Sequence, residues 1–205
     1  MKRVVTSLAL ALAVVAAPSA LAATTTYRAT LSGPAEATPN PSPGTGIATI
    51  IIDDVAMTMQ LSVPFYDLIG TTTAAHIHCC TPVPLTGTAG VATVVPNFPG
   101  FPTGVTSGLY EATFDLNSAS SFNPTFITNN GGTLEAARTV FFNGLNANQS
   151  YLNLHTSAYP GGEIRGWLVA APAAPVPEPE SWAMLALGLG TVGFVARRRK
   201  QAQQS

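Results

Sequence analysis

Short runs of alternating apolar and polar residues fill the middle of the chain, and they constrain its fold more than any other feature. Residues 57–63 carry apolar side chains at every odd position, and a β-branched run over 46–52 precedes them, with Asp53-Asp54 between the two. Strict alternation is typical of a strand with one buried face, so these runs predict a hairpin. Further strands are expected over 27–32, 72–78, 90–95, 109–116, 149–155 and 163–169.

About eight short strands, separated by turns rich in glycine, proline and asparagine, predict a mostly β fold: an antiparallel Greek-key-like sandwich or barrel. Residues 118–130 and 133–145 differ, because their apolar residues have helical spacing, and one or two short inserted helices are expected there. The β domain is assigned to residues 23–170, a length sufficient for one hydrophobic core.

The first 22 residues have the pattern of a secretory signal peptide. Lys2 and Arg3 precede an apolar run over 4–17, and Ala20-Leu21-Ala22 offers small residues for cleavage by signal peptidase after Ala22. The alternative, a retained membrane anchor, calls for a longer apolar run. The chain is therefore predicted to be exported.

The C-terminal end has three parts behind an Ala/Pro linker at 171–176. They are Pro177-Glu178-Pro179, an apolar segment over 182–196, and the basic cluster Arg197, Arg198, Arg199 and Lys200. The apolar segment is at the lower limit for a transmembrane helix, and the basic cluster is expected to stay on the cytoplasmic side of the inner membrane.

This tail, residues 177–205, resembles the PEP-CTERM sorting signal of Gram-negative bacteria. The resemblance implies transient anchoring in the inner membrane, recognition by an exosortase, and release to the cell surface or the exopolysaccharide matrix. The alternative is an ordinary C-terminal anchor.

Charge and motifs exclude several functions for the domain. It contains three arginines, no lysine and eight acidic residues, a net charge of −5. Such a surface repels phosphate backbones, so nucleic acid is excluded as a partner, while cations, neutral polysaccharides and surface proteins are compatible with it. The sequence shows no catalytic triad, catalytic carboxylate pair or cofactor loop. An enzyme is therefore the less favoured interpretation.

All three histidines of the chain fall on predicted polar strand faces. His76 and His78 are two residues apart, so they share one face of a strand while Ile77 faces the core. His155 ends a strand whose leucines take the core face. Other polar residues on these faces are Tyr151, Asn153, Glu163 and Arg165.

If these strands are neighbours, the imidazoles of His76, His78 and His155 could bind copper or zinc. Glu163 and Arg165 could pair with each other or orient an imidazole, and Tyr151 and Asn153 could support the site or recognise a ligand. The alternative is a metal-free structural or recognition cluster.

Cys79 and Cys80 follow His78 directly, in a compartment that is oxidising. Adjacent cysteines can close only a small ring, so they cannot staple distant parts of the fold. A bonded or inert pair is favoured over free thiols, intermolecular bridges or ligands of a soft metal ion.

The domain resembles the CHRD domain, named from chordin. The resemblance is carried by residues 27–33 with Glu36, and by 75–78, 151–156 and 160–166; Cys79-Cys80 departs from it, because Gly and Pro are expected there. It implies an extracellular β-rich module without a catalytic role. The predicted function is an exported surface or matrix protein with a binding or structural module. The alternative is a metal-binding protein or oxidoreductase that uses the three histidines.

Overall fold

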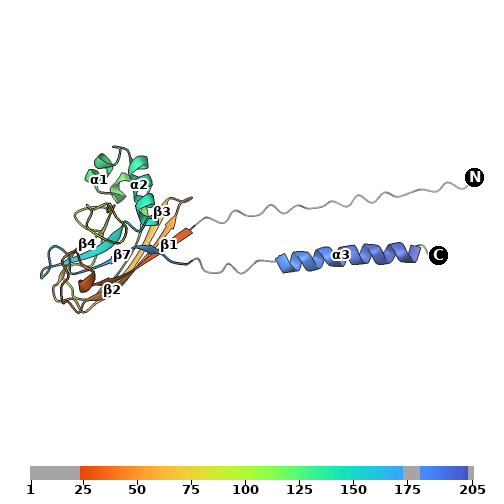
Figure 1. Ribbon diagram of the computed structural model, residues 1–205, viewed down its shortest axis with the longest axis horizontal. Coiled ribbons are helices and arrows are strands. Elements are labelled where there is room, and N and C mark those ends of the chain that lie inside the picture. The colour runs from red at the N-terminus through yellow and green to blue at the C-terminus, as the bar shows by residue number, and fades with distance from the viewer. Residues whose placement is uncertain (1–23, 173–180, 203–205) are drawn as a thin grey trace, which may run out of the picture.

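The computed structural model describes residues 24–172 and 181–202 of the 205-residue chain. The predicted signal peptide at 1–22 and the sorting residues Pro177-Glu178-Pro179 lie outside the described residues, as does most of the linker. What is described is an antiparallel sheet curled into a half-barrel, with short helices at one end and a separate C-terminal helix (Figure 1). The predicted fold class is confirmed.

Eight strands form one sheet in the order β4-β6-β7-β1-β2-β3-β5, with β8 paired to β1. Their bounds are β1 Thr24–Ser32, β2 Thr45–Asp53, β3 Thr58–Tyr66, β4 Thr72–His78, β5 Gly108–Asp115, β6 Tyr151–Thr156, β7 Ile164–Trp167 and β8 Val169–Ala170. The β2–β3 hairpin closes through Asp53, whose Oδ1 accepts hydrogen bonds from the amides of Val55 and Ala56. This order places β4, β6 and β7 side by side, although over 70 residues separate β4 from β6 in sequence.

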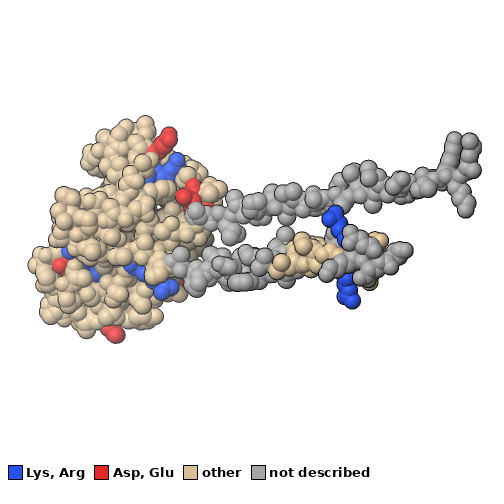
Figure 2. Space-filling view, turned by 45° about the vertical axis from the view of Figure 1, so that its right-hand side comes forward, with Lys and Arg blue, Asp and Glu red and all other residues tan. Residues whose placement is uncertain are grey.

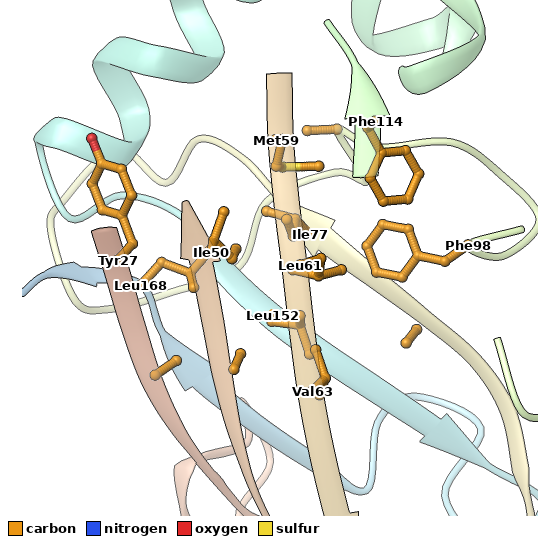
Figure 3. Packing of buried hydrophobic residues seen from close by; sticks show 14 of the residues in the cluster. Tyr27, Ile50, Met59, Leu61, Val63, Ile77, Phe98, Phe114, Leu152 and Leu168 are labelled. Atoms are coloured by element: carbon orange, nitrogen blue, oxygen red, sulfur yellow. The ribbon is translucent and has the colours of Figure 1, made fainter. Parts of the chain in front are cut away.

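The hydrophobic core lies in the concave face of the half-barrel. Alternate residues of each strand point into it, and Figure 3 shows Met59 and Leu61 of β3 meeting Ile77 of β4 and Leu152 of β6. Phe98, from the irregular segment between β4 and β5, stacks on Tyr110 with ring centroids 5.6 Å apart. Each such side chain contributes about 1.5–3 kcal/mol by burial. Core packing therefore fixes which face of β4 and β6 is polar.

The two inserted helices are α1, Pro124–Asn129, and α2, Leu134–Asn146. The side chains of Asn123 and Thr133 accept hydrogen bonds from first-turn amides and so cap the two N-termini. Phe141 of α2 is buried against Phe122, with ring centroids 5.8 Å apart. These helices, with the 3-10 turns η1 Gly33–Ala35 and η2 Ala119–Ser121, complete the domain.

The strand predicted over 90–95 does not form. Val91 and Thr93 make single bridges to different partners, His78 and Phe122. The carbonyl of Ile77 accepts from the amides of both Ala92 and Thr93, so the segment crosses β4 instead of running along it. The prediction was wrong because alternation over a few residues cannot exclude a crossing segment.

The C-terminal helix α3 spans Ser181–Ala202 and contains the apolar segment 182–196. Among the described residues, no helix is both long and apolar enough to cross a bilayer. The predicted transmembrane segment is therefore not supported: its apolar part is short, and the basic cluster at 197–200 continues the same helix.

Candidate metal centre

The three histidines converge on the polar face of β4 and β6. Cross-strand register places His76 opposite Asn153, His78 opposite Tyr151, and His155 opposite Ala74, so all these side chains share one face. The ring centroids of His76 and His155 are 5.4 Å apart, and each lies 6.1 Å from the ring centroid of His78. One ring nitrogen from each histidine lies within 4.8 Å of the other two. The structure thus brings the predicted ligands together.

Each imidazole is oriented by one backbone carbonyl. His76 Nε2 lies 2.7 Å from the Pro96 oxygen, and His78 Nδ1 and His155 Nδ1 each lie 2.9 Å from the oxygens of Ala89 and Pro160. A carbonyl can only accept, so the bonded nitrogen of each ring carries the proton. The other nitrogen of each ring is unprotonated, buried and without a hydrogen-bond partner: His76 Nδ1, His78 Nε2 and His155 Nε2.

Burial keeps these imidazoles neutral. It lowers the pKa of all three histidines, that of His78 to about 4, and outweighs the opposing effect of the carbonyl hydrogen bonds. The histidines also lower one another's pKa, since His155 disfavours charge on both His76 and His78. At neutral pH the cluster therefore offers three lone pairs and no competing protons.

Tyr151 and Arg165 hold the loop that orients His78. The Tyr151 ring stacks on His78 with centroids 4.8 Å apart, and its hydroxyl donates to the Ala89 carbonyl. Arg165 donates to the Gly87 carbonyl at 3.2 Å, and its guanidinium carbon lies 4.9 Å from the Tyr151 ring centroid. Both side chains therefore support the carbonyl that fixes the tautomer of His78.

Asn153 lies between the histidines and a buried carboxyl, that of Glu36. The Asn153 amide nitrogen donates to Glu36 Oε2 at 3.5 Å and to the Gly161 carbonyl at 3.4 Å. Burial raises the pKa of Glu36 to about 7, although Arg165 and two hydrogen bonds act to lower it. Glu36 Oε1 and Asn153 Oδ1 are buried without a partner. The alternation pattern could not reveal Glu36, because it follows η1 outside any strand.

Glu163 lies outside this cluster. Its carboxylate accepts hydrogen bonds from the hydroxyls of Ser42 and Thr156 and from the amides of Ile69 and Gly70, at 2.6–3.0 Å. Burial alone would raise the pKa of Glu163, but these four hydrogen bonds lower it below its ordinary value. Within residues 24–172 it forms no ion pair with Arg165. Its role is to tie three segments of chain to the start of β7.

Cys79 and Cys80 form a disulfide with each other. Cys79 is buried, and both sulfurs pack against Gly144 of α2, where an added Cβ would overlap them. With both thiols in this bond, neither is available as a ligand for a soft metal ion. The pair joins the end of β4 to the helical part of the domain by packing alone.

A curled antiparallel sheet with a three-histidine cluster on its polar face defines a small β-rich module. The chain belongs to the CHRD domain family, whose family model matches residues 27–168. The PEP-CTERM protein-sorting motif matches residues 175–200, so both predicted resemblances are confirmed. This motif implies an exported, membrane-anchored precursor that an exosortase-type enzyme processes. No curated protein and no solved structure matches the chain.

Proposed function

We propose that the domain binds one copper or zinc ion through His76 Nδ1, His78 Nε2 and His155 Nε2. The observation that carries the proposal is the set of three buried, unprotonated nitrogens without partners in one cluster. One ring nitrogen of each histidine lies within 4.8 Å of the other two, and three atoms at that spacing share a point at most about 2.8 Å from each. Ring movements of less than about 1 Å then reach metal–imidazole distances of about 2.0–2.1 Å.

The cost of burying unpartnered nitrogens favours a ligand bound between the three imidazoles. A buried polar atom without a hydrogen bond costs about 1–3 kcal/mol, and the cluster contains three. Protonation would satisfy these nitrogens only by charging imidazoles whose pKa is lowered by burial. A metal ion satisfies all three lone pairs at once, and the carbonyls that hold the opposite nitrogens fix the tautomers that metal binding needs.

The donor set selects the class of metal. Imidazole suits copper and zinc, whereas magnesium and calcium are bound through carboxylate, carbonyl and water oxygens. Within the described part of the chain, the cluster comprises His76, His78 and His155 without an acidic residue. Copper is expected to bind more tightly than zinc, following the general order of divalent affinities.

Calorimetric titration of the purified protein with Cu²⁺ and Zn²⁺ tests the proposal. We expect one ion per chain for the wild type and none for His76→Ala/His78→Ala. Gln60→Ala/Ser62→Ala is the matched control, because it removes two polar side chains from strand β3, away from the histidines. Equal stoichiometry in wild type and histidine variant would overturn the proposal, and circular dichroism would show that both are folded.

A second candidate function is a module that binds neutral polysaccharide at the cell surface or in the exopolysaccharide matrix. It is favoured by a shallow groove of about 370 Å³ on the polar face of β2, β3 and β5, lined by Thr49, Gln60, Ser62, Glu111 and Thr113. Hydroxyls and amides suit sugar hydroxyls, and the domain surface in Figure 2 carries few charged side chains. Removal of the tail by the exosortase would release the module to that location.

A further inference from the structure

The histidine cluster offers three ring nitrogens as ligands. Zinc sites that only stabilise a fold use four protein ligands, whereas sites with three keep a position for an exchangeable molecule. In the described residues, no cysteine, aspartate or glutamate joins the cluster. His76 is buried, whereas His78 and His155 are half-buried. A metal ion there would have a fourth position that the protein does not fill with a charged ligand.

Asn153 is a polar neighbour of the three histidines on the same strand face. It lies opposite His76 across the β4–β6 ladder and two residues from His155 on the same face. The side chain is 4% exposed, and its amide nitrogen is bonded to Glu36 and Gly161. Its Oδ1 is a buried acceptor without a donor, and Glu36 Oε1 is a second one nearby. A buried acceptor without a donor is expected to receive a hydrogen bond from a bound ligand that carries a proton.

This inference rests on the proposed metal site. We infer that the bound metal ion takes a small oxygen ligand with a proton at its fourth coordination position. The Oδ1 of Asn153 would accept a hydrogen bond from that ligand. Water and hydrogen peroxide belong to this class of ligand, whereas azide does not, because it has no proton to donate. A metal ion makes a bound water more acidic and thus a stronger donor. Asn153 is therefore a positioning residue that selects protic over aprotic ligands.

Azide titration of the full-length, Cu²⁺-loaded protein tests the open position. Azide displaces an exchangeable water and gives a charge-transfer absorption band. We expect a saturable band in the wild type. Copper binding without any response to azide would overturn this inference and leave the proposed function intact, while failure to bind copper would overturn the proposed function itself.

Asn153→Leu tests the hydrogen bond. In this variant the metal-bound water loses its hydrogen bond to Asn153, whereas azide never made one, so azide displaces the water more easily. The azide dissociation constant should fall about three- to tenfold, while the copper affinity changes by no more than about twofold. Asn153→Asp keeps an acceptor and should bind azide no more tightly than the wild type. Asn143→Leu, on the exposed side of α2, is the matched control. If Asn153→Leu does not fold, Asn153→Ala is measured in the same way. An azide affinity within twofold of the wild type would contradict the proposed role of Asn153.

Discussion

The polar face of the sheet has two halves that obey the same alternation and differ in what covers them. In the covered half, on β4, β6 and β7, the side chains of His76, Asn153 and Arg165 are buried. In the open half, on β2, β3 and β5, Gln60, Glu111 and Thr113 are exposed, while Thr49 and Ser62 are half-buried. The difference comes from outside the strands.

Irregular segments cover the first half and supply the carbonyls of Ala89, Pro96 and Pro160 to the three imidazoles. Burial is what lowers the pKa of each histidine, so the covering segments turn an ordinary polar face into a cluster of neutral imidazoles. The open half keeps its side chains solvated, and its groove can make only weak, exchangeable contacts. Strand pleating determines which residues lie on the polar face, and the loops determine whether those residues are buried or solvated.

The largest expected change in stability follows from altering a buried carboxylate. We predict that Glu163→Gln lowers the free energy of unfolding by about 4 kcal/mol, because an amide replaces one oxygen that accepts from Gly70 and Thr156. The matched variant Glu111→Gln in the open half should change it by less than about 0.5 kcal/mol. Urea denaturation of both variants measures the difference. Losses of similar size would show that burial does not distinguish Glu163 from the solvated carboxylate of Glu111.

Acid should destabilise the metal-free protein through the covered half. His78 has a folded pKa of about 4 and an ordinary unfolded pKa near 6.5. Between these pH values His78 is protonated in the unfolded chain but not in the folded one. Its contribution to the free energy of unfolding is therefore complete above about pH 6.5 and is lost as the pH falls to about 4. For His78 alone the loss amounts to about 3 kcal/mol.

Urea denaturation of the metal-free wild type and of His78→Gln at several pH values isolates this loss. The stability advantage of the wild type should shrink by about 3 kcal/mol between pH 7 and pH 4. Glu36, whose raised pKa gives the opposite pH dependence, contributes equally to both proteins and cancels in the difference. Parallel pH profiles would contradict a buried, neutral His78.

Much of this arrangement could be predicted from the sequence. Alternation located the hairpin of β2 and β3 and placed His76, His78 and His155 opposite the leucines and isoleucines of the core, because a strand admits only two faces. It misplaced Glu163, which precedes the first residue of β7 and follows Gly162, whose φ of +130° breaks the pleat. The face rule holds only inside a strand.

The partners that orient the imidazoles were beyond sequence reasoning. Backbone carbonyls such as that of Pro96 carry no residue-type signal, and a loop's path over a sheet depends on contacts far apart in the chain. Glu36 is 117 residues from Asn153, its hydrogen-bond partner. The three candidate ligands can therefore be predicted from local periodicity, while the environment that keeps their imidazoles neutral is set by tertiary structure.

The smallest expected effect lies in the open half. Gln60→Ala/Ser62→Ala should change the free energy of unfolding by less than about 0.5 kcal/mol, since solvated polar side chains contribute little to stability. The same variant should lose affinity for a neutral glucan, measured as reduced retardation during electrophoresis through gels containing hydroxyethyl cellulose. His76→Ala/His78→Ala serves as the control and should be retarded like the wild type. A wild type that migrates equally with and without the polysaccharide would leave the open half without a ligand. The two halves would then differ as a buried histidine cluster and a plain solvated surface.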